Sequence, residues 1–169
     1  MNTYPQPRPP GPPGQMIPFG AVTASSETLV NRKRILIVDD SVVILRTLSM
    51  KLKSCGYDVL TAADGGTAVS VVRRERPDLI LLDISFPPDV AHGGGVAWDG
   101  FLIMDWLRRL DEAKHIPVII ITGGDPEKLK DRALAAGAIG FFQKPINNDD
   151  LLASIRDTIG ESPAIPPAA

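Results

Sequence analysis

The sequence predicts a doubly wound α/β domain, in which a parallel sheet of five strands carries helices on both faces. Two observations lead to this fold class. Short apolar runs alternate along the chain with longer segments of helical periodicity, which is the pattern of repeated strand–helix–strand units. Three of the runs are apolar throughout, as strands that are covered on both faces must be.

The strands follow in order from these runs. The three fully apolar strands are expected at 35–38, 79–82 and 118–121. Two weaker segments, 58–62 and 140–143, complete the sheet, and we expect them to flank the others.

Residues that favour helix ends predict where the helices lie between the strands. Ser41 can cap the first helix, in which leucines recur on one face, and Gly56 follows its end. The last helix stops at Gly160. The other starts are marked by Asp64, by Asp125 with Pro126 at the first helical position, and by Asn147 or Asn148.

Length and composition fit one domain with two tails. The 169 residues are 44% apolar and 22% charged, which is typical of a soluble globular protein. We place the domain at 32–160, between a proline-rich disordered tail at 1–31 and a disordered C-terminal tail at 161–169. The first tail has Pro-x-x-Pro spacing, which leaves open a docking role beside that of a solvated tail.

Charge, apolar runs and cysteine content limit the partners and the location. The formal charge of −2 is too small to imply a nucleic acid or an anionic membrane as partner. No apolar run is long enough to span a bilayer, and the N-terminus lacks the pattern of a secretory signal. Cys55 is the only cysteine, so no internal disulfide can form. We therefore expect a cytoplasmic protein.

Polar side chains follow four of the five strands. Asp39 and Asp40 end the first strand, Asp83 the third and Thr122 the fourth, and Lys144 follows the fifth. Because ligands of open parallel sheets bind outside the carboxyl ends of the strands, we expect these side chains to meet at one rim.

The chemistry of this rim points to phosphoryl transfer. Clustered carboxylates need a counter-charge, and hard oxygen ligands with water suit Mg²⁺. Asp83 is the expected nucleophile because it ends the most apolar strand, while Asp39 and Asp40 would hold the metal. Lys144 would neutralise the phosphoryl oxygens, and the Thr122 hydroxyl would donate to them once they are present.

The segments that carry these residues resemble the receiver domain of bacterial response regulators, the family of the chemotaxis response regulator. The matching pieces, within about 34–160, are Ile-Leu-Ile-Val-Asp39-Asp40-Ser, Pro-Asp-Leu-Ile-Leu-Leu-Asp83-Ile, Pro-Val-Ile-Ile-Ile-Thr122-Gly and Gly-Phe141-Phe-Gln-Lys144-Pro145. The resemblance implies a flavodoxin-like fold with strand order 2-1-3-4-5 and a cis bond before Pro145. It implies Mg²⁺-dependent transfer to Asp83 from a phosphohistidine of a sensor kinase or phosphotransfer protein, followed by slow self-catalysed hydrolysis.

The resemblance also assigns roles to further residues. Thr122 and Phe141 would form the switch, with the threonine turning toward the phosphate and the ring moving inward. Ser85 would give its backbone carbonyl to Mg²⁺, and its side chain, facing the entering water, would set the phosphate lifetime. Gly124 would contribute nothing to positioning that water. The output would be a contact with a downstream protein, and the chain would be a signalling phosphoacceptor rather than an enzyme with a separate substrate.

One departure from the family pattern is an insertion at 88–98, between Pro87 and the Asp99-Gly100 pair that should begin the third helix. Its glycines fit a tolerated surface loop or a lid or docking element, and both interpretations stay open. An exposed Trp98 would favour docking.

Other functions fit the rim less well. A flavin-binding module would not place Asp39-Asp40 where a bare phosphate binds. A haloacid-dehalogenase-type phosphatase would need an acid at position 85, where this chain has serine. The remaining alternative is a receiver fold that binds proteins without being phosphorylated.

Overall fold

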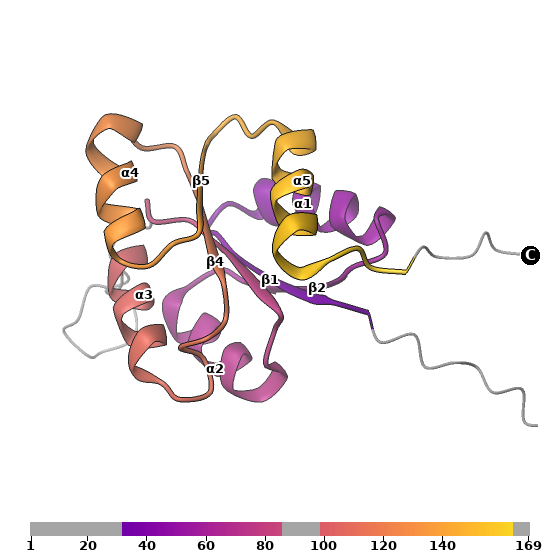
Figure 1. Ribbon diagram of the computed structural model, residues 1–169, viewed down its shortest axis with the longest axis horizontal. Coiled ribbons are helices and arrows are strands. Elements are labelled where there is room, and N and C mark those ends of the chain that lie inside the picture. The colour runs from indigo at the N-terminus through magenta and orange to yellow at the C-terminus, as the bar shows by residue number, and fades with distance from the viewer. Residues whose placement is uncertain (1–31, 86–98, 164–169) are drawn as a thin grey trace, which may run out of the picture. The chain divides into compact units, whose positions relative to one another are not determined.

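The computed structural model describes residues 32–85 and 99–163. Its core is one five-stranded parallel sheet in the order β2-β1-β3-β4-β5 (Figure 1). The strands are β1 (Arg34–Val38), β2 (Asp58–Ala62), β3 (Leu79–Leu82), β4 (Val118–Thr122) and β5 (Gly140–Gln143). The predicted strand positions and order are confirmed, and the weaker strands β2 and β5 form the two edges.

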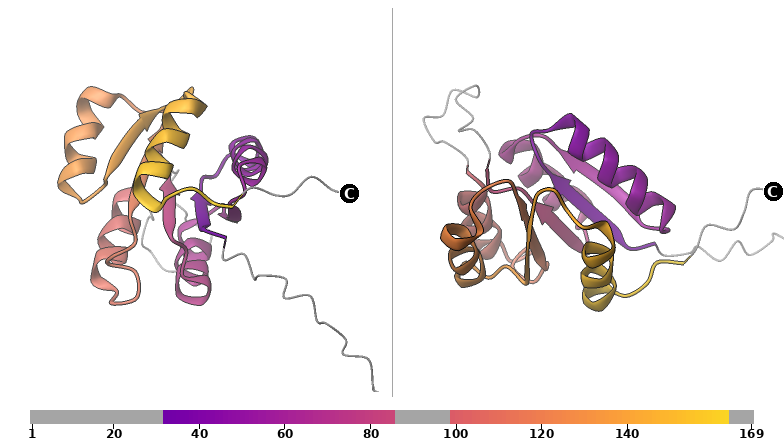
Figure 2. Two further views of the ribbon diagram at one scale, coloured as in Figure 1. Left: turned by 45° about the vertical axis from the view of Figure 1, so that its right-hand side comes forward. Right: turned by 90° about the horizontal axis from the view of Figure 1, so that it is seen from above.

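Five helices cover the sheet on both sides (Figure 2). They are α1 (Val42–Ser54), α2 (Gly65–Glu75), α3 (Gly100–Arg109), α4 (Pro126–Ala135) and α5 (Asn148–Ile159). Helices α1 and α5 pack on one face of the sheet, and α2, α3 and α4 pack on the other. The doubly wound class is therefore confirmed.

The central strands are apolar throughout because each contributes to two cores. In β3, Leu79 and Leu81 pack against α1 and α5, whereas Ile80 and Leu82 pack toward α2, α3 and α4. All four side chains are at most 1% exposed. Burial of one such side chain contributes about 1.5–3 kcal/mol to folding, so the end of β3 is firmly held.

The predicted caps begin the helices. The Ser41 hydroxyl accepts a hydrogen bond from the Ile44 amide, and the Asp64 carboxylate accepts one from Thr67. Asn147, and not Asn148, caps α5. These caps fix where the chain turns from each strand end into the next helix.

Several sequence-based expectations lie outside the described residues. They are the tail at 1–31, the C-terminal tail apart from 161–163, and the insertion at 88–98 with Trp98. The pair after the insertion is described: Asp99 caps α3 and Gly100 is its first residue, as predicted. Within the described part of the chain, no helix is long and apolar enough to cross a membrane.

Candidate phosphoacceptor site

The ends of β1, β3 and β4 place the candidate residues side by side. The Asp83 amide donates to the Val38 carbonyl at 2.8 Å, so Asp83 continues the pairing of β3 with β1. The Lys144 amide donates to the Thr122 carbonyl at 2.8 Å in the same way. Parallel pairing therefore brings residues distant in sequence to one rim of the sheet.

The Lys144 ammonium joins the two buried carboxylates at this rim. Its Nζ lies 2.6 Å from Asp39 Oδ2 and 2.7 Å from Asp83 Oδ2. Asp39 is fully buried and Asp83 is 3% exposed, so water screens these contacts little. The ion pairs fix both carboxylates opposite one positive charge.

Backbone amides hold the second oxygen of each buried carboxylate. The Ser41 amide donates to Asp39 Oδ1 at 2.9 Å, and the Ser85 amide donates to Asp83 Oδ1 at 2.7 Å. With one amide and one ammonium bonded to it, each carboxylate still has lone pairs for a further partner.

Asp40 completes an acidic cluster. One carboxylate oxygen from each of Asp39, Asp40 and Asp83 lies within 4.8 Å of the others, and Asp40 is exposed. The three carboxylates carry more negative charge than the one ammonium can neutralise, and every potential metal ligand in the cluster is a hard oxygen atom. This donor set fits a divalent cation such as Mg²⁺, which takes carboxylate oxygens and keeps several waters.

Burial and the hydrogen bonds of Lys144 shift two pKa values at the site. Burial raises the pKa of the Asp39 carboxyl above its ordinary value, although the hydrogen bonds from Lys144 and the Ser41 amide act in the opposite direction. Burial acts to lower the pKa of Lys144, but its hydrogen bonds to Asp39 and Asp83 outweigh this, so that pKa is raised. The lysine therefore remains charged, and the cluster favours an added cation.

Thr122 is buried at the end of β4, and its hydroxyl already has partners. Its Oγ1 accepts a hydrogen bond from the Gly124 amide at 3.1 Å. Ser85 Oγ also lies within hydrogen-bond distance of Thr122 Oγ1, and either hydroxyl can be the donor. Ser85 is exposed, yet its hydroxyl is directed to Thr122.

The remaining candidates lie on β5 and just after it. Phe141 is half-buried and packs against the core beneath α2, α3 and α4. The bond between Lys144 and Pro145 is cis, as the resemblance implied. The structure thus brings Asp39, Asp40, Asp83 and Lys144 together at one rim. It adds the contact between Ser85 and Thr122.

Sequence reasoning missed several contributors to the site. The Ser41 amide, the hydroxyl pairing of Ser85 and the hydrogen bond from the Gly124 amide to Thr122 were not foreseen. An Asx turn after a strand-ending aspartate is a local signal that could have indicated the Ser41 amide. The hydroxyl pair joins the segment after β3 to the end of β4, 37 positions away, and has no such local signal.

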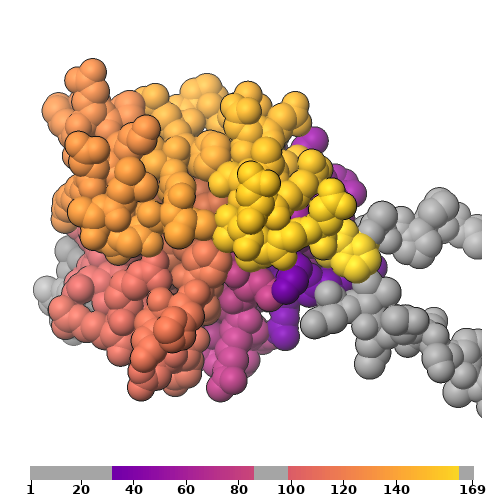
Figure 3. Space-filling view, in the orientation of Figure 1, coloured from indigo at the N-terminus to yellow at the C-terminus, as the bar shows by residue number. Residues whose placement is uncertain are grey.

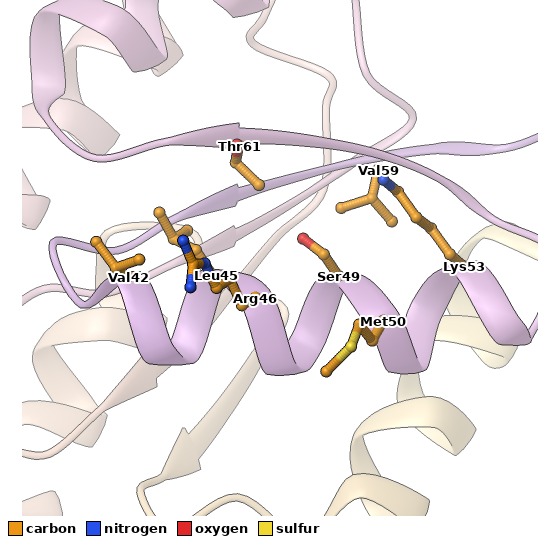
Figure 4. Close-up of a pocket in the computed structure, with 8 residues that line it drawn as sticks. All are labelled: Val42, Leu45, Arg46, Ser49, Met50, Lys53, Val59 and Thr61. Atoms are coloured by element: carbon orange, nitrogen blue, oxygen red, sulfur yellow. The ribbon is translucent and has the colours of Figure 1, made fainter.

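A separate groove of about 480 Å³ runs between α1 and β2 (Figure 4). Val42, Leu45 and Met50 line it from α1, with Val59 from β2. Its lining includes none of the candidate residues, so the candidate phosphoacceptor site is distinct from it.

The curated relatives of the chain include a response regulator and transcriptional regulators. The chain is 38% identical over 123 residues to the response regulator PleD of Caulobacter vibrioides, covering 73% of this chain and 25% of PleD. It is 37% identical over 122 residues to protein PilH of Pseudomonas aeruginosa, covering 72% of this chain and 93% of PilH. The chain therefore spans about a quarter of PleD but nearly all of PilH.

Solved structures and a family model agree with these relatives. The chemotaxis response regulator CheY4 of Vibrio cholerae superposes with a TM-score of 0.64 at 32% identity, covering 75% of this chain and 98% of CheY4. A CheY-like receiver domain protein of Methanospirillum hungatei gives 0.65 at 30% identity, covering 76% of this chain and 94% of that protein. The model of the response regulator receiver domain matches residues 35–156. The chain therefore belongs to the response regulator receiver domain family.

Proposed function

We propose that this chain accepts a phosphoryl group on Asp83 and transmits the signal through protein contacts. Membership of the receiver family supports a role in two-component signalling in general. The observation that carries the specific proposal is the Lys144 ammonium, which bridges the buried carboxylates of Asp39 and Asp83 beside Asp40.

The residues present would hold Mg²⁺ through Asp39, Asp40, Asp83 and the Ser85 backbone carbonyl. Bound there, the cation would neutralise charge on the phosphoryl oxygens. A carboxylate oxygen of Asp83 forms the new bond to phosphorus, while the bond from phosphorus to the histidine nitrogen of the donor breaks and its electron pair stays on that nitrogen. The Lys144 ammonium balances the charge of the transferred group.

Further groups respond once the phosphate is in place. The Thr122 hydroxyl turns to donate to a phosphoryl oxygen, and the Phe141 ring moves inward, which changes the surface of α4, β5 and α5. These three elements lie side by side in the upper part of the face shown in Figure 3. This surface is where we expect the downstream protein to bind.

The phosphodonor in this proposal is a sensor histidine kinase or a phosphotransfer protein, and the setting is the cytoplasm. The protein catalyses its own phosphorylation and slow dephosphorylation, and it acts on no separate substrate. Neither nucleic acid nor membrane is a direct partner of the receiver domain in this scheme.

Incubation with Mg²⁺ and acetyl phosphate, followed by intact-mass measurement, tests the proposal. The protein should gain the mass of one phosphoryl group, and Asp83→Asn or removal of Mg²⁺ with EDTA should abolish the gain. Asp111→Asn is a matched control because Asp111 is 92% exposed and lies in the connection from α3 to the start of β4. Absence of any gain in the folded parent protein would favour the alternative, a protein-binding module that is not phosphorylated.

A further inference from the structure

The contact between the hydroxyls of Ser85 and Thr122 joins the segment after the phosphoacceptor to the end of β4. The two residues are 37 positions apart in sequence. The Ser85 backbone is tied to the phosphoacceptor as well, since its amide donates to Asp83 Oδ1 at 2.7 Å. Ser85 therefore contacts both the acceptor and the threonine that should respond to the phosphate.

The Thr122 hydroxyl has two partners in this arrangement. A hydroxyl has one proton to donate and can accept two hydrogen bonds. Thr122 Oγ1 accepts from the Gly124 amide at 3.1 Å and shares the second hydrogen bond with Ser85. If Thr122 is the donor to Ser85, its proton is already in use. If Ser85 is the donor, the Thr122 oxygen accepts one hydrogen bond from the Gly124 amide and one from the Ser85 hydroxyl.

The hydroxyl pair also lies against the segment that leads into α4. A Cβ atom placed on Gly124 would lie 3.5 Å from Ser85 Oγ and from Thr122 Oγ1, and 2.3 Å from Leu129 Cδ1. A change in the orientation of Thr122 therefore alters the hydrogen bond to the Gly124 amide, one residue before the cap of α4.

We propose that Ser85 is a positioning residue whose hydroxyl holds Thr122 in the resting orientation, so that it opposes the turn toward the phosphate. This inference rests on the proposed function, because it concerns the response to a phosphoryl group on Asp83. It differs from a role of Ser85 in hydrolysis, since it acts on the equilibrium between the two orientations of Thr122.

The test uses beryllium trifluoride, an analogue of the phosphoryl group that does not undergo the hydrolysis step, at saturating Mg²⁺. Ser85→Ala removes a hydrogen bond that is made only in the resting state. This variant should therefore bind the analogue about fivefold more tightly than the parent protein does. Ser85→Thr retains a hydroxyl and should lose most of the tightening that Ser85→Ala shows. In a Thr122→Val background, which lacks the hydroxyl that Ser85 contacts, Ser85→Ala should change the affinity no further.

A spectroscopic measurement accompanies the titration. The amide resonance of Gly124 in analogue-free Ser85→Ala should lie part of the way toward its position in the analogue-bound parent protein, and in Ser85→Thr it should not move. A purely structural role of Ser85 would not shift this resonance along that line.

The outcomes separate the two levels of the proposal. Three results would each overturn the role of Ser85. They are unchanged or weaker binding of the analogue by Ser85→Ala, a Ser85→Thr variant that behaves like Ser85→Ala, and an effect of Ser85→Ala that persists in the Thr122→Val background. If the parent protein shows no binding that depends on Asp83, the proposed phosphoacceptor function itself fails.

Discussion

At the scale of single residues, the site depends on one cation placed between two buried acids. Burying a carboxylate without a partner costs several kcal/mol, and Lys144 partners both Asp39 and Asp83. The third carboxylate, Asp40, is exposed and needs no such partner to fold. The arrangement is therefore stable enough to form while still favouring a further cation.

Lys144→Met should lower the free energy of unfolding by about 3 kcal/mol at neutral pH without divalent ions, because it leaves Asp39 and Asp83 buried without a counter-charge. Urea denaturation measures the effect, which should shrink when Mg²⁺ supplies replacement charge. Lys114→Met is the matched control: its ion pair with Asp111 is on the surface, and its loss should cost less than about 1 kcal/mol. Equal costs for the two variants would contradict this account of the site.

At the scale of elements, the first turn of α3 lies directly against the backbone of Asp83 and Ile84. A Cβ atom on Gly100 would lie 2.4 Å from Ile84 Cα and 2.6 Å from the Asp83 carbonyl oxygen. These are backbone atoms that cannot move aside without displacing Asp83. Glycine is therefore required at the start of α3 for packing.

Gly100→Ala should lower the free energy of unfolding by about 2 kcal/mol, because the added methyl overlaps backbone atoms. Helix propensity alone would give the opposite sign, a gain of about 1 kcal/mol. Gly123→Ala is the control, since no heavy atom of the described residues, other than those of Gly123 and its two chain neighbours, lies within 4 Å of its added Cβ. Denaturation of both variants under one set of conditions shows whether each substitution raises or lowers the free energy of unfolding. A stabilised Gly100→Ala protein would contradict the close approach of α3 to the Asp83 backbone.

A second element-scale contact fastens the segment after α5 to the turn after α1. The Tyr57 hydroxyl donates to the Gly160 carbonyl oxygen at 3.1 Å, and the buried Ser162 hydroxyl donates to the Gly56 carbonyl oxygen at 2.7 Å. A Cβ atom on Gly56 would lie 2.5 Å from the Pro163 carbonyl oxygen. Gly56 follows the end of α1 with φ +91°, which favours glycine. Its lack of a side chain also leaves room for the Pro163 backbone.

The buried Tyr57 hydroxyl predicts a pH dependence of stability. Burial, more than the neighbouring Cys55 and Glu161, raises the pKa of Tyr57 above its ordinary 10.0, although Arg156 acts in the opposite direction. A raised folded-state pKa means that its contribution to stability is complete below pH 10.0 and is lost as pH rises through the folded-state pKa.

The measurement is the difference in free energy of unfolding between the parent protein and Tyr57→Phe, taken over about pH 8 to 11. The difference should be constant at the lower end and fall above the ordinary tyrosine pKa. Because lysines titrate in both proteins, the subtraction isolates Tyr57. A difference that stays level over the whole range would show that the hydroxyl does not titrate with folding.

At the scale of the whole molecule, the proposed Mg²⁺ site would link metal binding to the stability of the fold. Its carboxylates come from β1 and β3, so they converge only when the sheet has formed. A ligand that binds the folded state alone adds about 2.7 kcal/mol at a concentration 100 times its dissociation constant. Stability in Mg²⁺ therefore reports on the whole cluster.

MgCl₂ should raise the melting temperature of the parent protein, and Asp40→Asn should remove most of that rise, because Asp40 supplies one carboxylate of the cluster. Asp157→Asn is the control, as Asp157 is an exposed acid on α5 that belongs to no such cluster of the residues at 32–85 and 99–163. Scanning calorimetry with and without the salt provides the measurement. An equal rise in Asp40→Asn and in the parent protein would place the cation elsewhere.

Local patterns in the sequence were enough to predict the strands, the helix starts and the residues of the rim. Periodicity and caps act within a few residues, so β3 and the cap at Asp64 can be recognised from their own segments. The convergence of Asp39, Asp83 and Lys144 followed from one rule, that parallel strands end at the same edge.

Contacts that depend on side-chain direction across the sheet were decided only by the tertiary structure. The sequence does not show that the hydroxyl of Ser85 meets that of Thr122, or that Ser162 reaches back 106 positions to Gly56. Nor does it show that Gly100 touches the backbone beside Asp83. Each of these contacts joins segments that no local pattern connects, because packing of the completed sheet and helices sets the distance between them.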